Sequence, residues 1–195
     1  MNIWLTSDTH YGHKNIASKN ISNWSSGYRK FDSLYEMNQT IINNINTCAK
    51  EDDILYHLGD WSFGGISNIL LFRNQLICKN IHLILGNHDQ HILDKEHTTD
   101  SGETFNPIHL FKSVQKCFTG NIGKNKFHLS HYAHRVWEGQ HKGVIHLYGH
   151  SHGSLPPLGL SMDVGLDNNK EFKPYHINDI LTIMSKREIH KNDQH

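Results

Sequence analysis

Short apolar runs, separated by polar and turn-forming stretches, recur along most of this chain. Several of them combine Ile, Leu, Val, Trp and Tyr over only three to six residues. Runs of this length and composition are typical of buried strands. We predict strands at residues 3–5, 53–58, 81–85, 113–118, 126–130, 144–148 and 161–164.

Apolar residues at steps of three and four predict helices between some of these strands. The first helix begins after Ser33, because Ser33-x-x-Glu36 has the form of a capping box that satisfies free backbone N–H groups. Its apolar face consists of Leu34, Met37, Ile41 and Ile45. A second helix is predicted from Ile66, Ile69, Leu70, Arg73, Leu76 and Ile77, and a short last helix from Ile177, Ile180, Leu181 and Met184.

The strand–helix–strand order predicts an α/β fold in a single domain over residues 1–195. Each early strand runs into a polar loop at its carboxyl end, which is where such folds place their sites. Residues 11–30 and 90–112 are polar and irregular, and the first of these stretches predicts a long loop beside the site. No repeat or linker divides the chain, and residues 185–195 are expected to fray.

Five short segments rich in His and Asp contain the candidate metal-binding and catalytic residues, and nearly all of these segments follow a predicted strand. Residues two apart in an extended chain point the same way, so Asp8 and His10 can reach one metal ion from the end of their strand. The segments are Asp8-Thr9-His10, Gly59-Asp60, Gly86-Asn87-His88-Asp89, His131 and Gly149-His150-Ser151-His152.

Together these segments provide enough oxygen and nitrogen donors for two divalent cations that share one carboxylate. Such a pair is suited to phosphate-ester hydrolysis, because it binds a hydroxide and two phosphoryl oxygens. Asp60 is the candidate for the shared ligand, and Gly59 before it allows a tight turn. The many imidazoles favour transition metals over magnesium or calcium, so we expect manganese first, with iron, zinc, nickel or cobalt as alternatives.

The ordered set DTH, GD, GNHD, a lone His and GHSH, which runs from Asp8 to His152, resembles the calcineurin-like metallophosphoesterase superfamily. The stretches SDTHYGHKNI, HLGD and HLYGHSHG are similar to small bacterial and phage members that lack a capping domain. This resemblance implies a two-sheet β-sandwich flanked by helices in α/β/β/α layers. The apolar pattern alone does not distinguish that fold from a doubly wound single sheet.

The resemblance also implies the ligand set and the catalytic group. One metal ion would be bound by Asp8, His10, Asp60 and His152, and the other by Asp60, Asn87, His131 and His150. Asn87 and His88 would contact the phosphate, and His88 would protonate the leaving alkoxide after attack by a metal-bridging hydroxide. Asp89 would hold the His88 imidazole and favour its protonated form.

Residues near these segments are weaker candidates. Arg29 could bind phosphate through a bidentate contact, although a solvated loop charge is an equal reading, and for Lys14 it is the better one. His13 could support a ligand. His134 and Arg135 could reach the substrate, or could belong to a loop anchored by Trp137.

Three further residues precede or follow the expected bridging carboxylate. His57 is more simply a core histidine than a ligand. Trp61 and Phe63 could stack on a nucleobase, but packing as an apolar wall beneath the metal ions is the favoured reading.

Composition narrows the picture without deciding it. Lys plus Arg equals Asp plus Glu at 19 each, so no net charge attracts nucleic acid or an anionic membrane. The three cysteines lack a zinc-binding spacing and are read as reduced, mostly buried thiols. No leader or membrane-spanning run is evident, so we expect a cytoplasmic protein. The 18 histidines are separated into ligands and others only by position.

Three hypotheses follow from these residues. The first is a metal-dependent phosphodiesterase or phosphomonoesterase that acts on a small phosphate ester such as a nucleotide or cyclic nucleotide. The second is a nuclease, which the neutral charge and the lack of a capping domain disfavour. The third is a non-catalytic metal-dependent binding scaffold, which the complete ligand set disfavours.

Overall fold

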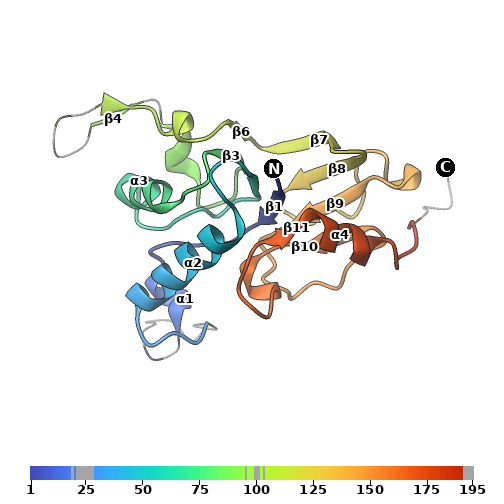
Figure 1. The fold of residues 1–195 in the computed structure, drawn as a ribbon, viewed down its shortest axis with the longest axis horizontal. Coiled ribbons are helices and arrows are strands. Elements are labelled where there is room, and N and C mark those ends of the chain that lie inside the picture. The colour runs from blue at the N-terminus through green and yellow to red at the C-terminus, as the bar shows by residue number, and fades with distance from the viewer. Residues whose placement is uncertain (19, 21–28, 95, 99–101, 103, 191–195) are drawn as a thin grey trace.

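The computed structural model describes residues 1–18, 20, 29–94, 96–98, 102 and 104–190. Its strands form two main sheets, and helices α2 (Leu34–Cys48) and α3 (Ile66–Gln75) lie on one side of the first sheet, as Figure 1 shows. The described chain is therefore an α/β fold with two packed sheets and flanking helices. The predicted fold class is confirmed.

The first sheet has the strand order β11-β1-β2-β3-β6. Strands β1, β2, β3 and β6 pair in parallel, so their carboxyl ends reach the same edge of the sheet. The short strand β11 pairs antiparallel at the outer side of β1. The bounds are β1 Ile3–Thr6, β2 Ile54–His57, β3 Asn80–Ile84, β6 Ser113–Gln115 and β11 Tyr175–His176.

The second sheet has the order β10-β9-β8-β7. Strands β7 and β8 form an antiparallel hairpin, whereas β8, β9 and β10 pair in parallel. Parallel pairing again brings strand ends together, here those of β8 and β9. The bounds are β7 Cys117–Ile122, β8 Asn125–Ser130, β9 Ile145–Tyr148 and β10 Ser161–Asp163.

The strand predicted at residues 113–118 is two strands in different sheets. Strand β6 pairs with β3 in the first sheet and β7 pairs with β8 in the second, so the chain passes from one sheet to the other at Lys116. The run of strand-forming residues continues across this change, which is why the pattern alone predicts one strand.

The first predicted helix is present as α2, with its predicted start. The Ser33 hydroxyl accepts a hydrogen bond from the Glu36 N–H at 3.0 Å, and the Glu36 carboxylate accepts one from the Asp32 N–H at 2.7 Å. Helix α3 ends at Gln75, so two residues assigned to its apolar face lie beyond it, and Ile77 is 51% exposed. The last helix is α4 (Ile177–Met184), as predicted.

Two apolar cores lie on opposite faces of the first sheet. Residues of α2 and α3, such as Met37, Ile41 and Phe72, pack against Leu55 and Ile81 of the sheet. Alternate residues of the same strands turn the other way, because successive side chains of a strand point to opposite faces. The core between the sheets consists mainly of Leu5, Leu58, Ile84, Phe127, Leu129, Ile145 and Leu147, with Ile177, Ile180 and Met184 from α4.

The stretches expected to be irregular contain short elements. Residues 11–30 include helix α1 (Lys14–Ala17), and residues 21–28 lie outside the described part. Residues 90–112 include two 3-10 helices, η1 (Gln90–Leu93) and η2 (Pro107–Leu110), and the small pair β4 (His97–Thr98) and β5 (Thr104–Phe105). Of the tail expected to fray, residues up to 190 are described, and the Arg187 guanidinium donates to the Ser161 carbonyl.

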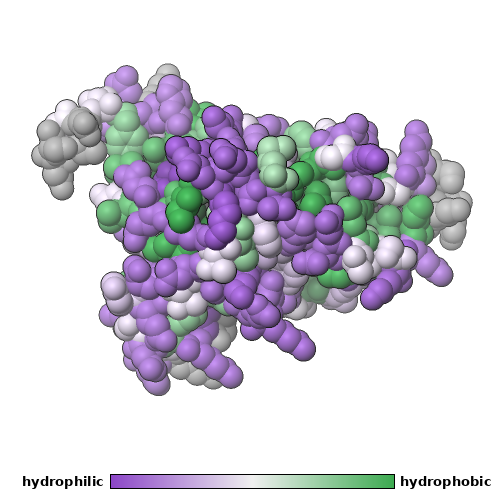
Figure 2. All heavy atoms as spheres, viewed as in Figure 1, coloured by the Kyte–Doolittle hydropathy of each residue, from purple (hydrophilic) through white to green (hydrophobic). Residues whose placement is uncertain are grey.

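The surface shown in Figure 2 is mostly hydrophilic on that face, with apolar side chains in separate patches. Among the described residues, no helix combines the length and apolar character needed to cross a membrane. All three cysteines are free thiols, but only Cys78 is buried. Cys117 is exposed because it begins β7, the outermost strand of the second sheet, which corrects the expectation of mostly buried thiols.

Residues 134–144 pack on the outer face of the second sheet, where His128, His134 and His146 interact. The His134 N–H donates to Nε2 of His146 at 2.9 Å, and His146 Nδ1 lies 3.1 Å from the His128 carbonyl. Trp137 is buried and donates to the Val144 carbonyl at 2.8 Å, as expected for the alternative in which Trp137 anchors this loop. Because Nε2 of His146 accepts, its ring is neutral with the proton on Nδ1.

We predict that His146 makes the fold less stable in acid. Burial lowers the pKa of His146 from 6.5 to about 3, so as the pH falls only the unfolded chain takes up this proton. This group should therefore remove about 2 kcal/mol from the free energy of unfolding between pH 7 and pH 5. Urea unfolding in the presence of a chelator measures it: the pH dependence should be smaller by that amount in His146→Gln. The exposed His109→Gln is the control, and equal pH dependence in the two variants would contradict the prediction.

Candidate metal centre

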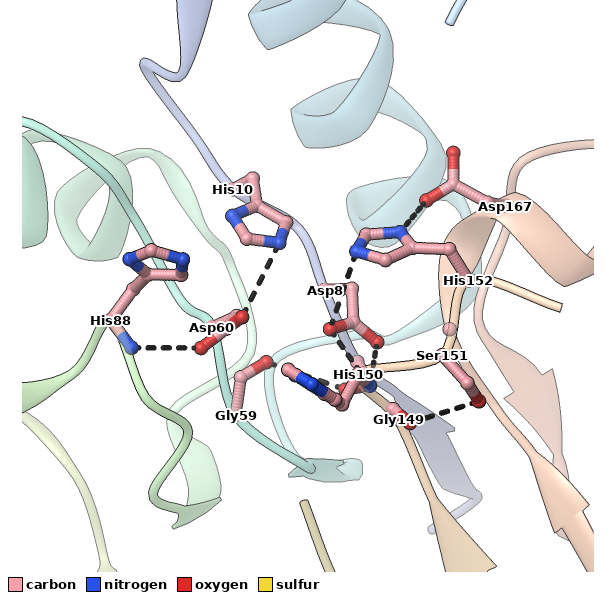
Figure 3. Close-up of polar contacts among 12 residues, drawn as sticks. Asp8, His10, Gly59, Asp60, His88, Gly149, His150, Ser151, His152 and Asp167 are labelled. Carbon is pink, nitrogen blue, oxygen red and sulfur yellow. Dashed lines mark hydrogen bonds and ion pairs between the residues drawn. The ribbon is translucent and has the colours of Figure 1, made fainter. Parts of the chain in front are cut away.

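The five His- and Asp-rich segments meet at neighbouring strand ends. Figure 3 shows side chains from these segments turned toward one another. The first three segments follow β1, β2 and β3 of the first sheet, and the other two follow β8 and β9 of the second. Ligand atoms of Asp8, His10 and His152 lie within 4.8 Å of one another, as do those of Asp60, His131 and His150. These two groups correspond to the two predicted shells.

The backbone at these residues is held in a conformation that most residues avoid. Among the described residues, six other than glycine have positive φ, and five of them are predicted metal ligands: Asp8, His10, Asp60, His150 and His152. Left-handed backbone is uncommon outside glycine and is retained where function requires it. Its concentration at these residues is an independent sign of a functional site, and the sequence carries no such signal.

Glycines next to the ligands allow the strand ends to approach closely. Gly59 has a φ of +96°, and a Cβ there would lie 2.6 Å from both the Gly86 nitrogen and the His131 ring. A Cβ on Gly149 would overlap the Ser7 side chain and lie 2.5 Å from an oxygen of Asp8. Only glycine fits at either position, as expected for Gly59 from the sequence.

Asp60 lies between the two groups of imidazoles. Its Oδ2 is 3.4 Å from Nε2 of His10 and 3.5 Å from Nε2 of His131, and the carboxylate is 2% exposed. Neighbouring donors around one ion with bonds of about 2.1 Å are roughly 3.0–3.4 Å apart. These distances are close to those expected if the Asp60 oxygen and His10 bound one ion, and the same oxygen and His131 bound a second ion.

The His10 imidazole is a buried group whose nitrogens lack hydrogen bonds. Among the described residues, neither ring nitrogen of His10 has a hydrogen-bond partner, although the residue is only 3% exposed. Burial, with Arg29 and His152 nearby, holds the pKa of His10 well below 6.5, so the ring is neutral. A buried neutral imidazole with a free lone pair has the protonation state that a metal ligand needs.

The Nε2 lone pair of His131 lies close to two other hydrogen-bond acceptors. Its Nδ1 is 2.8 Å from the Leu58 carbonyl, which can only accept, so Nδ1 carries the proton. Burial lowers the pKa of His131, so the ring is neutral and Nε2 has a lone pair. That nitrogen lies 3.1 Å from Oδ1 of Asn87 and 3.5 Å from Asp60. A cation between these acceptors would satisfy all of them.

Asp8 and His152 form the other side of the site. The Asp8 carboxylate is fully buried, accepts from the His150 N–H at 3.0 Å, and lies 4.0 Å from Nε2 of His152. Burial raises the pKa of Asp8 to about 7, with His152 opposing and Asp60 adding to the shift. A divalent cation would offset the cost of keeping this carboxylate ionised.

Asp167 is a functional residue that the sequence reasoning missed. Its Oδ2 is 2.7 Å from Nδ1 of His152, which directs Nε2 of that ring toward Asp8. Burial alone would raise the pKa of Asp167, but the Arg29 guanidinium and the His152 ring lower it to about 2. A carboxylate behind a ligating imidazole is the usual support in metal sites. No motif marks Asp167, which is 15 residues beyond His152 in the chain.

Asp163 was also missed, and it holds the last ligand segment in place. Its carboxylate accepts from the Ser151 hydroxyl at 2.9 Å, from the Gly153 N–H at 2.9 Å and from the Gly165 N–H at 2.7 Å. These bonds fix the loop that carries His150 and His152. Because Asp163 ends strand β10, its position depends on the pairing of β10 with β9.

The expectation that Asp89 holds the His88 imidazole is wrong. The Asp89 carboxylate is 2% exposed and accepts from the backbone N–H groups of Asp60, Trp61 and Gly86 at 2.7–2.9 Å. These buried donors would otherwise be unsatisfied, so the carboxylate turns inward. Burial raises the pKa of Asp89 to about 6, and the three N–H groups oppose the shift. Asp89 therefore joins two ligand loops instead of acting on the substrate.

His88 is an exposed imidazole of the site, as is the proposed ligand His150. The His88 backbone N–H donates to Oδ1 of Asp60 at 3.0 Å, and its ring centre is 5.4 Å from that of His10. His13 lies beside it, is only 3% exposed, and stacks on Phe63 with ring centres 4.0 Å apart. Burial lowers the pKa of His13 to about 4, so this ring is neutral. Phe63, at 36% exposed, thus forms part of the rim of the site.

Arg29 does not face the site as a phosphate-binding group. It is 4% exposed, and its guanidinium donates to the carbonyls of Asp8 and Thr9 and, through two nitrogens at 2.9 Å each, to Asp167. With these donors engaged inside the protein, Arg29 binds the first ligand segment and the Asp167 support together. The predicted bidentate contact exists, but its partner is a carboxylate of the protein.

Most of the remaining weak candidates are ordinary core or surface residues. His57 is fully buried, with Nε2 2.9 Å from the Thr9 hydroxyl, and Trp61 is fully buried against Phe72 and Phe111. Both are core residues beneath the site, as favoured from the sequence. Lys14 and Arg135 are exposed. His134 is hydrogen-bonded within the histidine group on the second sheet, and it also lines a pocket beside Asn87 and His131.

Comparison with known proteins identifies the family. The model of the calcineurin-like phosphoesterases matches residues 1–182, which is most of the chain. The chain belongs to this family. The donor set described above fits the divalent metal ions that this family implies.

Individual relatives add little about activity. An uncharacterised protein, MJ1445 from Methanocaldococcus jannaschii, is 34% identical over 97 residues, and the match covers 45% of this chain and 47% of that protein, so the chain spans about half the length of this relative. A protein of unknown function from Aquifex aeolicus, AQ665, has the same fold, with a TM-score of 0.64, 19% identity and coverage of 93% and 98% of the two chains.

We predict that Asp167 supports metal binding through His152. Replacement by Asn in Asp167→Asn removes the charge that faces His152 and Arg29, and affinity for Mn²⁺ should fall by about 10–100-fold. Isothermal titration of the metal-free protein measures this, with the exposed Asp179→Asn as the control. Unchanged affinity in a variant that still unfolds cooperatively would show that Asp167 is structural only.

Proposed function

We propose that the chain hydrolyses a phosphodiester or phosphomonoester at a site that holds two divalent cations shared by Asp60. One observation carries this proposal: the Asp60 oxygen lies 3.4 and 3.5 Å from neutral imidazoles of two separate ligand groups. When bound, the two cations would supply an activated hydroxide and neutralise the phosphoryl oxygens. The proposed ligands are Asp8, His10, Asp60, Asn87, His131, His150 and His152.

His88 is the group we assign to the leaving oxygen. It is an exposed imidazole that is not needed in either proposed ligand set, and a ligand atom of His88 lies within 4.8 Å of those of His10 and Asp60. A side chain there can donate a proton or a hydrogen bond to the departing oxygen without competing for a deeply buried metal position. Asn87 precedes it at the same strand end and would orient the phosphate through its amide.

Manganese is the ion we favour, with iron, zinc, nickel and cobalt as alternatives. The donor set combines two carboxylates and one amide oxygen with four imidazoles. Imidazole suits the later transition metals, and the oxygen donors suit manganese and iron. The assignment depends on this chemistry and not on any distance that distinguishes one metal from another.

We predict metal-dependent turnover that requires Asp60. Hydrolysis of p-nitrophenyl phosphate and bis-p-nitrophenyl phosphate should appear on adding Mn²⁺, Ni²⁺ or Co²⁺ to the metal-free protein. Asp60→Asn should reduce kcat on the order of a hundredfold or more, because both cations lose a charged shared ligand. The exposed Asp52→Asn is the control. If no cation produces turnover that the Asp60 variant lacks, the proposal is wrong.

We predict that the effect of His88→Asn depends on the leaving group. The p-nitrophenolate ion leaves without a proton, so turnover of methyl p-nitrophenyl phosphate should fall by less than about tenfold. Alkyl oxyanions need protonation, so turnover of an alkyl ester with the same phosphoryl group should fall by about 100-fold or more. Parallel kcat measurements on methyl p-nitrophenyl phosphate and dimethyl phosphate compare the two cases. Equal losses on both esters would remove His88 from the role of acid.

A further inference from the structure

Two unlike pockets share Asn87 in their linings. The apolar pocket, of about 480 Å³, is lined by Leu85, Leu93, Cys117 and Tyr132 together with the ligands Asn87 and His131. The polar pocket, of about 460 Å³, is lined by Ser62, Phe63, Gly64 and His91 together with Asn87 and His88. Both therefore open directly onto the candidate metal centre.

The apolar pocket presents side chains that a protein normally covers. Leu93 is 53% exposed and Tyr132 is 49% exposed, although both are large apolar residues. They come from η1 and from the residues after β8, and Cys117 comes from β7, so three separate segments contribute to one concave surface. Exposed apolar side chains gathered in a pocket beside polar groups are typical of a ligand site.

The polar pocket contains the group assigned to the leaving oxygen. His88 lines it, and Ser62 on its wall is 5% exposed, with a hydroxyl that has no hydrogen-bond partner among the described residues. An ester arm that departs toward His88 would enter this pocket. The lining of the apolar pocket does not include His88, so an arm placed there is not the one that leaves.

We propose that the substrate is a phosphodiester whose retained arm carries a planar aromatic ring, bound in the apolar pocket. This inference rests on the proposed function, because it assigns the two arms around a phosphate at the metal centre. A phosphomonoester has a single arm and would leave one pocket empty. The exposed Tyr132 ring offers a stacking partner, and Leu85 and Leu93 offer apolar contact, which suits an aryl group or a nucleobase.

Three diesters with one leaving group test the proposal. Methyl, phenyl and thymidine 5′ p-nitrophenyl phosphates all release p-nitrophenol, and differ only in the retained arm. We expect the Mn²⁺-loaded protein to give a higher kcat/KM for the phenyl or thymidine ester than for the methyl ester. The preferred ester shows whether the ring is an aryl group or a nucleobase. The monoester p-nitrophenyl phosphate should be the poorest of the four.

The esters differ in intrinsic reactivity, and comparing the same esters across protein variants cancels that difference. In Leu93→Asn, the ratio of kcat/KM for the aromatic over the methyl ester should fall about tenfold relative to the unmodified protein. Cys117→Asn, on a different segment of the same pocket, should reduce the ratio in the same direction. Leu71→Asn is the matched control, because Leu71 is 52% exposed and lies outside both pockets, and it should leave the ratio unchanged.

The outcomes separate this inference from the proposed function. Metal-dependent hydrolysis with the same ratio in Leu93→Asn, Cys117→Asn and Leu71→Asn would overturn the assignment of the apolar pocket and leave the phosphoesterase site intact. A preference for the monoester would overturn it as well. Absence of metal-dependent turnover on all four esters would overturn both.

Discussion

The rest of this structure depends on how a set of buried acceptors is held together. Asp60 has an oxygen within 3.5 Å of two neutral imidazole nitrogens, and His131 faces Asn87 with a lone pair. Such groups repel or go unsatisfied unless a cation lies among them. Burying these acceptors without a metal ion costs free energy. The surrounding backbone must therefore hold them in place.

Charged residues that form hydrogen bonds to other parts of the chain, and not to substrate, hold this backbone in place. Asp89 accepts three backbone N–H groups and joins the loops after β2 and β3. Arg29 and Asp167 join the loop after β1 to the His152 imidazole of the second sheet. Because these charges are satisfied internally, the strained left-handed residues between them are held in place. The two sheets thus contribute to one rigid site.

The division of the chain between the two sheets also shapes the surface around the metal centre. Strand β6 ends in the first sheet, β7 begins in the second, and the change at Lys116 places Cys117 beside the ends of β3 and β8. The pocket formed there is apolar, whereas the one on the His88 side is polar. The proposed ligands therefore lie next to two pockets of different polarity.

The sequence by itself determined most of the fold and all the proposed ligands. Apolar runs placed the main strands, and the capping box placed the start of α2, because these features depend on neighbouring residues. Tertiary structure alone decided that residues 113–118 belong to two sheets, that Asp89 and Arg29 face inward, and that Asp163 and Asp167 support the last ligand loop. The sequence does not show whether a carboxylate or guanidinium will bind the substrate or the protein backbone. The partner of such a group is chosen by packing between segments that are far apart in the chain.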